Sequence, residues 1–440
     1  MFDINTELGV CLTRLLKSHP QNIVLGLKRI RLVAEKLGLP MEQEEVRLDS
    51  KVIVVAGTNG KGSVCAILEQ ILIEAGYSTS LYSSPHILNF EERLKINGSF
   101  LSADDWIEAF ENVENARLSS TAESLTFFEA ATVAAFFLVN KKKPEIAIFE
   151  VGLGGRLDAV NLLANDCSII TSISLDHQSF LGSCREQIGW EKAHIARRKK
   201  PFIIADLAPP NTVITLAKKF EADIVKFGSD FKFYSNDAQW DWMGRKKSRL
   251  GLAYPALRGL HQLNNASAAL ASLECLELDF PISQGAVRKG LAKVELPARF
   301  QVLPGKPTVI LDVAHNPEAA KMLSNSLDRI GFYPNTYAVV GILSDKDASQ
   351  ILKITAGKID YWLFATLDEN VAGSRSRPAQ SLSKKLFSII PNAEATCYES
   401  PLEAFNSAAQ MASSNDRIVV FGSFITVSSV WVVAHALGKA

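Results

Sequence analysis

The sequence lacks an excess of either charge, because 47 Lys and Arg residues balance 47 Asp and Glu residues. Without a basic excess, the composition gives no reason to expect a nucleic-acid partner, and no acidic block indicates a disordered tail. Cysteine is scarce, with six residues and no CxxC pair. The pattern therefore predicts neither a disulfide framework nor a zinc site.

Long hydrophobic runs are missing as well. The longest apolar stretches, near 130–139 and 424–437, fall short of the roughly 20 residues that a membrane-spanning helix needs. The N-terminus carries Asp3 and Glu7 and lacks the basic and then apolar order of a secretory signal. We therefore expect no membrane association and a cytoplasmic location.

The length and the pattern of the chain indicate more than one α/β domain. At 440 residues it is too long for one ordinary core, so two or three domains are expected. Strand-like runs alternate with helix-like segments, which predicts mostly parallel sheets with helices on both faces. Short aromatic-rich pieces at 227–242 indicate a small β excursion. The alternation restarts near Leu296 and Pro297, so we predict domains at 1–296 and 297–440.

A glycine-rich loop joins a strand-like run to a helix-like segment at 52–63, with the sequence VIVVAGTNGKGS. Glycines let backbone N–H groups approach phosphate oxygens, and the helix N-terminus adds a favourable dipole. Lys61 would reach the outer phosphates, and the Ser63 hydroxyl would lie near the metal ion. Gly62 separates these two residues, so the spacing is not that of the standard P-loop. A plain glycine turn is the alternative, which the order of strand, loop, lysine and hydroxyl disfavours.

Polar side chains follow three of the predicted strands: Ser84, Glu150 and His177. Ligands bind beyond the carboxyl ends of strands in open α/β sheets, so these side chains are expected to converge beside the phosphate loop. A carboxylate and a hydroxyl suit magnesium. Taken singly, a strand-end glutamate is more often a surface or capping residue, and a lone histidine is equally ambiguous. A second glycine cluster at 152–155 does not fit a dinucleotide motif and indicates a tight turn near a ligand.

Lys192 lies on a predicted helix from about 185 to 197, on the same face as Ile188 and Ile195. A lysine on an apolar stripe usually extends its amine to solvent. If the amine were partly desolvated, it would lose its proton more readily. A neutral amine can react with carbon dioxide to give a carbamate, which can bind a metal ion. The sequence leaves both possibilities open.

A series of strings in this order resembles the folylpolyglutamate synthase branch of the Mur ligases, and above all its bacterial bifunctional dihydrofolate synthase/folylpolyglutamate synthase members. The strings are GTNGKGS (57–63), SSPH (83–86), EVGLGGRLDA (150–159), LDH (175–177), EKAHIAR (191–197), DVAHNPEA (312–319) and FGSF (421–424). Their order and spacing hold across nearly the whole chain. The GLGGRLDA and DVAHNP strings are specific, whereas the phosphate loop alone would indicate only the wider superfamily.

The resemblance implies a Mur-ligase-like P-loop N-terminal domain, a Rossmann-like C-terminal domain and an active site in the cleft between them. It implies that ATP phosphorylates a substrate carboxylate and that the amine of L-glutamate attacks the acyl phosphate, releasing ADP and phosphate. The acceptors would be dihydropteroate, which gives dihydrofolate, and the γ-carboxylate of tetrahydrofolate. Two Mg²⁺ ions are implied, and a monovalent cation is a further candidate. The family is usually monomeric, so a monomer is expected.

The resemblance also implies site residues. One Mg²⁺ would be held by Ser84 and Glu150, and the other by His177 and a carbamylated Lys192; Lys61, Lys192 and His177 would be catalytic. ATP contacts would be Gly57, Thr58, Asn59, Gly60, Lys61, Gly62, Ser63, Asn265, Arg299 and Asp312. Pterin contacts would be Gly26, Leu27, Thr126, Phe128, Leu157, Asp158 and Ala159. His315 matches a motif histidine whose role stays open.

Two departures from the family pattern leave the folate form open. Val24 replaces the acid of a segment that commonly reads DLGLERV, and Phe127 stands where a tyrosine is common. The alternatives are a folylpolyglutamate synthase without the second activity, another Mur-type ligase acting on a cell-wall nucleotide precursor, and a P-loop kinase or nucleotide switch. The last gives no reason for a second domain that carries DVAHNP.

Overall fold

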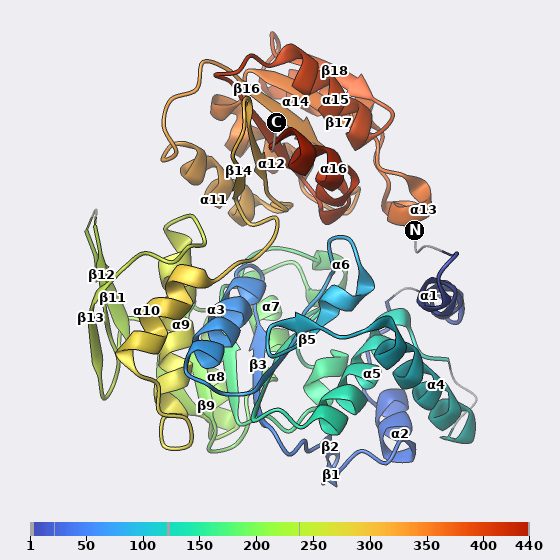
Figure 1. Cartoon of the computed structure of the whole chain (residues 1–440), viewed down its shortest axis with the longest axis vertical. Helices are drawn as coiled ribbons and strands as arrows, with labels where there is room; N and C mark the ends of the chain where they lie inside the picture. Colours follow the sequence, from blue (N-terminus) through green and yellow to red (C-terminus); the bar gives the residue numbers. More distant parts are fainter. Residues whose placement is uncertain (1–3, 22, 121–123, 237, 439–440) are drawn as a thin grey trace.

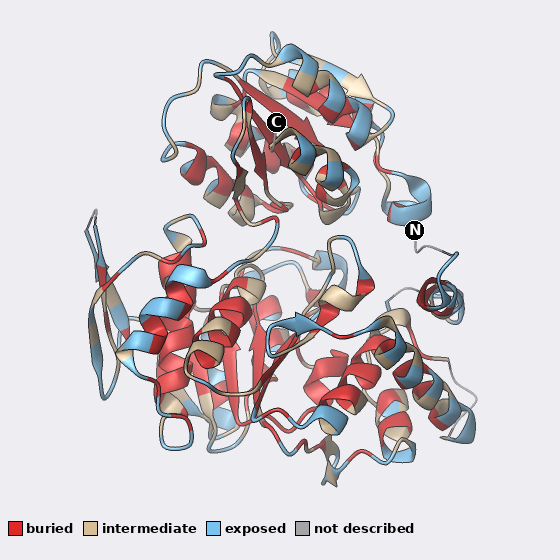
Figure 2. Ribbon diagram, viewed as in Figure 1, coloured by how far each residue is buried: buried red, intermediate tan, exposed pale blue. Residues whose placement is uncertain are grey.

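The computed structural model describes residues 4–21, 23–120, 124–236 and 238–438. Figure 1 shows two bodies: a larger one from the N-terminal part of the chain, coloured blue to yellow, and a smaller one above it, coloured orange to red. Each body is built around its own sheet, and Figure 2 shows that buried residues concentrate in those sheets and in the helix faces against them. Every helix within the described ranges falls short of the length and apolar character that crossing a membrane requires.

The larger body contains an eight-stranded sheet with the order β10-β9-β8-β3-β7-β4-β5-β6. The strands from β10 to β4 are parallel, and β5 and β6 continue the sheet as an antiparallel edge. Their bounds are β3 (Lys51–Ala56), β4 (Thr79–Tyr82), β5 (Leu94–Ile96), β6 (Ser99–Phe100), β7 (Ile146–Glu150), β8 (Cys167–Ile170), β9 (Pro201–Ile204) and β10 (Asp223–Lys226).

Helices cover both faces of this sheet, so the central strand β3 is apolar along its whole length. Its alternate residues enter different cores: Val52 and Val54 pack with α2, α4 and α5, whereas Ile53 and Val55 pack with α3, α9 and α10. The helix bounds are α1 (Glu7–Lys17), α2 (Lys28–Lys36), α3 (Lys61–Glu74), α4 (Ala103–Ser120), α5 (Phe127–Lys142), α6 (Gln178–Leu181), α7 (Arg185–Ala193), α8 (Asn211–Lys219), α9 (His261–Cys275) and α10 (Gln284–Lys293).

Two small antiparallel sheets complete the larger body: β1 (Met41–Glu42) with β2 (Glu45–Val46), and β11 (Lys232–Ser235) with β12 (Trp240–Met243) and β13 (Ser248–Leu252). In the second of these, Trp240 and Trp242 are buried in the same core as α9. The β excursion expected from the aromatic-rich segment is therefore confirmed. Single-turn 3₁₀ helices lie at Phe90–Arg93 and Ala159–Leu162.

The smaller body contains a six-stranded sheet with the order β14-β15-β19-β16-β17-β18, parallel except for β14. One face packs on α11, α12 and α14, and the other on α15 and α16. The bounds are β14 (Gln301–Leu303), β15 (Thr308–Leu311), α11 (Pro317–Leu327), β16 (Thr336–Val340), α12 (Ala348–Thr355), β17 (Tyr361–Ala365), α13 (Glu369–Ala372), α14 (Ala379–Ile389), β18 (Glu394–Tyr398), α15 (Pro401–Met411), β19 (Arg417–Phe421) and α16 (Phe424–Leu437). Short 3₁₀ helices follow α12 (Ala356–Lys358) and α13 (Gly373–Arg375).

Residues 294–300 connect α10 to β14 and so join the two bodies. The segment is anchored on the smaller body, where the Val313 N–H donates to the Ala298 carbonyl at 3.1 Å. We propose that the domains divide at 296/297, within this connection.

The helix that carries Lys192 is shorter than the sequence pattern predicts. It ends at Ala193 rather than near Arg197, so Ile195 lies beyond it. The backbone turns away because side chains take the place of helical hydrogen bonds: Asn165 Nδ2 donates to the Ile195 carbonyl at 2.9 Å, and Arg197 donates to the His194 carbonyl at 3.1 Å. Such side-chain donors satisfy the carbonyls that a helix end leaves open.

Candidate active site

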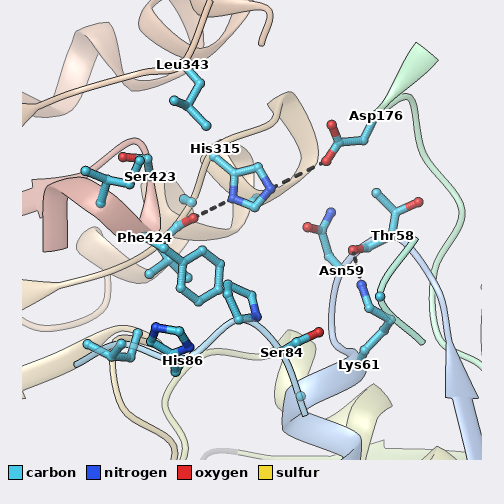
Figure 3. Close-up of a pocket in the computed structure, with 18 of the residues that line it drawn as sticks. Thr58, Asn59, Lys61, Ser84, His86, Asp176, His315, Leu343, Ser423 and Phe424 are labelled. Atoms are coloured by element: carbon cyan, nitrogen blue, oxygen red, sulfur yellow. Dashed lines mark hydrogen bonds and ion pairs between the residues drawn. The ribbon is translucent and has the colours of Figure 1, made fainter. Parts of the chain in front are cut away.

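A cavity of about 1010 Å³ lies between the two bodies. The larger body contributes the phosphate loop, and the smaller one contributes His315, Lys346 and Phe424. Figure 3 shows the phosphate loop, with Thr58, Asn59 and Lys61, facing the segments that carry His315 and Phe424. Ligand sites commonly occupy such clefts between domains.

The phosphate loop is held against the segment that follows β8. The Thr58 N–H donates to the Ser172 carbonyl at 2.6 Å, and Thr171 Oγ1 donates to the Asn59 carbonyl at 2.6 Å. Gly57 has a φ of 151°, and a Cβ there would lie 1.8 Å from Thr171 Oγ1, so the close approach requires glycine. The loop thus presents the N-terminus of α3, with Gly60 at the N-cap and Ser63 in the first turn.

Lys61 folds back over its own loop. Its Nζ donates to the carbonyls of Gly57 at 3.2 Å and Thr58 at 3.3 Å, and the side chain lines the cavity. Gly62 and Ser63 line the same cavity beside it. A lysine held at the mouth of a helix N-terminus is placed to meet the outer phosphates of a nucleotide.

Ser84 and Glu150 are brought together next to the phosphate loop. The Ser84 N–H donates to Glu150 Oε2 at 3.3 Å, and both residues line the cavity. Burial raises the pKa of Glu150, and the positive charges of Lys61 and Arg299 oppose the rise. A buried carboxylate beside a serine hydroxyl and a phosphate site offers oxygen ligands of the kind that Mg²⁺ prefers.

Lys192 is buried beneath the phosphate loop rather than extended to solvent. Its Nζ donates to the Gly57 carbonyl at 2.9 Å, and burial lowers its pKa to about 7, with a further contribution from the charge of Lys61. The close packing depends on Gly155, where a Cβ would lie 2.9 Å from the Lys192 Cα. At neutral pH a large share of this amine is therefore unprotonated.

His177 lies at the N-cap of α6 in the left-handed conformation, with a φ of 51°. Burial lowers the pKa of its imidazole to about 4, although the neighbouring Asp176 carboxylate opposes the shift. Its Nε2 lies 3.4 Å from Nζ of Lys346. Metal ligation through the same nitrogen would displace that contact. In the ranges that the structure describes, no group of three or more His, Cys, Asp or Glu side chains is arranged to hold a metal ion.

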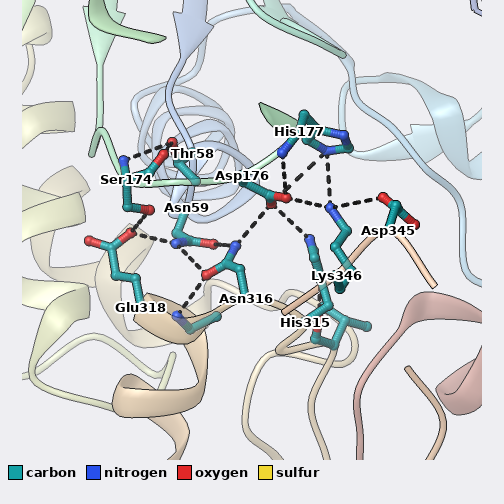
Figure 4. Close-up of polar contacts among 12 residues, drawn as sticks. Thr58, Asn59, Ser174, Asp176, His177, His315, Asn316, Glu318, Asp345 and Lys346 are labelled. Atoms are coloured by element: carbon teal, nitrogen blue, oxygen red, sulfur yellow. Dashed lines mark hydrogen bonds and ion pairs between the residues drawn. The ribbon is translucent and has the colours of Figure 1, made fainter. Parts of the chain in front are cut away.

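Asp176 is a functional candidate that the sequence reasoning missed. It accepts a hydrogen bond from Lys346, another from Asn316 Nδ2 at 3.1 Å, and lies 3.5 Å from His315 Nε2 (Figure 4). Burial alone would raise its pKa, but the His315 hydrogen bond and the nearby positive charges bring it well below the usual range. The available signal was its position in the LDH string, directly before the strand-end His177.

The remaining predicted nucleotide residues are at the junction of the two bodies. Arg299 and Asp312 line the cavity; the Arg299 guanidinium lies 5.1 Å from the centre of the Phe424 ring, and Asp312 accepts from the Phe300 N–H at 2.8 Å. Asn265 is not part of the cavity lining. It packs under the phosphate loop, where its Oδ1 lies 2.5 Å from the Cβ position of Gly60.

The predicted pterin residues lie outside the cavity lining, around the 152–159 loop. The Gly26 N–H donates to the Leu157 carbonyl at 3.2 Å, and the Phe128 ring lies 2.5 Å from the Cβ position of Gly152. The other predicted members are Leu27, which lines a second pocket, and the buried residues Thr126, Asp158 and Ala159.

Two of these pterin candidates have structural roles. Thr126 caps α5 in a capping box with Glu129, and Asp158 caps the short helix that follows it. These hydrogen bonds hold the local backbone of both segments.

Comparison with known proteins identifies the family. Residues 55–273 match the Mur ligase middle domain, and residues 298–424 match the glutamate ligase domain of Mur ligases. The chain is 37% identical to the dihydrofolate synthase/folylpolyglutamate synthase of Haemophilus influenzae, with 98% of both chains covered. The chain belongs to the Mur ligase family. It falls in the dihydrofolate synthase/folylpolyglutamate synthase branch, as the sequence strings predict.

Solved structures share the fold of this Mur ligase over almost its full length. Escherichia coli FolC in complex with DHPP and ADP superposes with a TM-score of 0.89 at 36% identity, with 98% of both chains covered. The bifunctional enzyme of Yersinia pestis complexed with AMPPNP and Mn ion gives a TM-score of 0.86 at 38% identity, again over 98% of both chains. The Mur ligase fold and the assignment as an ATP-dependent ligase that uses a divalent metal are therefore confirmed.

Proposed function

We propose that this Mur ligase joins the amino group of L-glutamate to the carboxylate of dihydropteroate, and to the γ-carboxylate of tetrahydrofolate. ATP transfers its terminal phosphoryl group to the acceptor carboxylate, and ADP leaves. The glutamate amine then attacks the acyl phosphate, so that an amide forms and phosphate is released. A related solved structure holds Mn, AMPPNP and L-glutamate together, which supports the same set of reactants here.

The observation that carries the proposal is the shared cavity. Lys61, Ser84, Glu150, His177 and Lys192 come from separate segments, and all five line one cavity that the second domain closes from the other side. Phosphoryl transfer depends on positioning and on electrostatic stabilisation more than on covalent chemistry by the protein. A cavity with these groups along one wall supplies both.

We propose two Mg²⁺ positions. The buried Glu150 carboxylate with the Ser84 hydroxyl fits the first, since phosphate oxygens and water complete the oxygen ligands of Mg²⁺. His177, neutral at pH 7, and a carbamate on Lys192 would hold the second. A bound Mg²⁺ supplies charge neutralisation at the phosphate oxygens. A monovalent cation is a further candidate cofactor, and we assign none of the described side chains to it.

The protein's own groups explain the rest of the chemistry. The N–H groups at the start of α3 and the Lys61 ammonium stabilise negative charge on the transferring phosphoryl group. Arg299 is half-buried and interacts electrostatically with Asp312 and Glu150, so it adds a positive charge at the domain junction. The second domain covers the cavity and keeps water from the acyl phosphate, which water would otherwise hydrolyse.

The pterin contacts stay part of the proposal as predicted: Gly26, Leu27, Thr126, Phe128, Leu157, Asp158 and Ala159. We also propose that the enzyme acts as a monomer in the cytoplasm on small molecules alone, without a nucleic-acid or membrane partner. The equal numbers of acidic and basic residues are consistent with that assignment.

The test is ADP release with dihydropteroate and with tetrahydrofolate, each with and without L-glutamate. We expect both acceptors to support release that depends on glutamate and that matches amide formation. Release with tetrahydrofolate alone would reduce the function to folylpolyglutamate synthase. Release that needs neither acceptor nor glutamate would exclude the ligase.

A further inference from the structure

The two domains meet through a reciprocal pair of hydrogen-bonding centres, one carboxylate from each: Asp176 is buried, and Glu318 is half-buried. Asp176 of the larger domain accepts hydrogen bonds from Lys346 and Asn316 of the smaller domain and forms an ion-pair contact with His315 of that domain. In return, Glu318 of the smaller domain accepts hydrogen bonds from three side chains of the larger one: the Asn59 amide, Ser172 Oγ at 3.0 Å and Ser174 Oγ at 2.9 Å. Figure 4 shows both centres, with Asn59 and Asn316 between them.

A pair of amides links the two centres. Asn59 Nδ2 donates to Asn316 Oδ1 at 3.1 Å, and Asn316 Nδ2 donates back to Asn59 Oδ1 at 3.0 Å. Both hydrogens of each amide are used, because Asn59 also donates to Glu318 and Asn316 also donates to Asp176. Because every amide hydrogen of Asn59 and Asn316 has an acceptor, the network favours one relative position of the two domains. Moving one domain against the other would leave several donors unpaired at once.

Glu318 contacts both the phosphate loop and the segment on which the loop rests. Asn59 belongs to that loop, and Ser172 and Ser174 belong to the segment on which the loop rests. Glu318 lies in the first turn of α11, where an acidic residue is favourable for the helix alone. The helix does not require the side-chain donors from the other domain, however, so those contacts indicate a role between the domains.

We propose that Glu318 is a positioning residue that clasps the second domain onto the phosphate loop and so protects the acyl phosphate from water. The proposal rests on the ligase function above. In the closed arrangement the glutamate amine attacks the acyl carbon, and an amide and phosphate form. In a loosened arrangement water attacks the same carbon, so that the free carboxylate and phosphate form and one ATP is spent without an amide.

The coupling ratio, amide formed per ADP released, reports this role. A variant that only lowers stability reduces the amount of active enzyme and leaves the ratio unchanged. In Glu318→Ala, which removes the acceptor of three hydrogen bonds, we expect the ratio to fall because hydrolysis rises at least about tenfold relative to amide formation. Tenfold is the effect of losing even one hydrogen bond to a charged group. Ser174→Ala should lower the ratio less, and the double variant should be no worse than Glu318→Ala because the two groups share one contact.

Glu403→Ala is the matched control. Glu403 is an exposed acid in the first turn of α15, after the N-cap Ser400, so it likewise places a carboxylate at a helix start, and among the described residues its side chain has no hydrogen bond or ion pair to the other domain. Its coupling ratio should equal that of the parent chain. If Glu318→Ala does not fold, two milder variants replace it in the test. Glu318→Gln keeps the side-chain volume, and Ser174→Ala removes a single hydroxyl.

Small-angle X-ray scattering with AMPPNP and Mg²⁺ supplies a readout that needs no turnover. The radius of gyration of Glu318→Ala should exceed that of the parent chain and of Glu403→Ala. If Glu318→Ala has the coupling ratio and the radius of gyration of the parent chain, Glu318 is not a positioning residue between the domains. If the parent chain makes no amide, the proposed function fails, and the radius alone then decides whether Glu318 holds the domains.

Discussion

Replacing Lys192 by Met should make the protein more stable and inactive at the same time. Lys192 is 5% exposed, and its Nζ donates a hydrogen bond to the Gly57 carbonyl at 2.9 Å. Burial lowers the pKa of the amine from 10.5 to about 7, so the folded state resists its positive charge. Methionine has nearly the same length and carries no charge. It therefore removes the free-energy cost of burying a charged amine and keeps the packing.

The stability gain depends on pH in a defined direction. Below pH 7 the amine is protonated in both states, and the pKa difference corresponds to a cost of about 5 kcal/mol to the folded chain. Between pH 7 and 10.5 the unfolded state binds more protons, so the free energy of unfolding of the parent chain rises with pH. The advantage of Lys192→Met should therefore be greatest near pH 6 and shrink to about 2 kcal/mol by pH 9.

Urea unfolding, followed by tryptophan fluorescence at pH 6 to 9 with EDTA and without carbon dioxide, measures this difference. Lys192→Met should lose most ligase activity, and Lys192→Ala should recover part of it when a small carboxylate such as acetate is added. A Met variant that is less stable than the parent chain at pH 6, or whose advantage does not change with pH, would refute the buried-charge reasoning. Near-normal turnover of Lys192→Ala without an additive would refute the carbamate.

Lys61→Ala should lower ADP release about 100-fold, the effect of removing one preorganised donor to a transition-state charge, and unchanged release would exclude the phosphate-loop assignment. Chelation by EDTA should abolish ADP release and added Mg²⁺ should restore it, whereas turnover without a divalent ion would contradict the metal sites. Glu69→Gln tests the pH argument away from the site. Burial raises the pKa of Glu69 from 4.5 to about 7, so a charge is forced into the core above pH 7. The variant should be more stable by about 3 kcal/mol at pH 8 and equal to the parent below pH 4.5, as urea midpoints would show.

Sequence patterns predicted the fold well where neighbouring residues alone determine the secondary structure. The continuous apolar run of β3 is typical of a strand covered on both faces, and the restart after Pro297 anticipated a second domain with its own sheet. The patterns failed where side chains replace backbone bonds, as at the end of α7, which Asn165 and Arg197 terminate early.

The residues of the candidate site also differ in how well the sequence predicts them. Lys61, Ser84, Glu150 and His177 follow strands of one sheet, so their meeting at the carboxyl edge follows from topology. Asp176 was missed because its partners are remote in sequence: Asn316 lies 140 positions away and Lys346 lies 170. No periodicity relates such positions, since only the docking of one domain on the other brings them together.

The central claim is that one cavity transfers phosphate from ATP to a carboxylate before glutamate attacks. The most direct measurement uses dihydropteroate labelled with oxygen-18 in its carboxylate, with mass analysis of the phosphate released during amide formation. The acyl phosphate route leaves one carboxylate oxygen on the phosphorus, so the phosphate should carry the label. Unlabelled phosphate, formed at the same rate as the amide, would contradict the account.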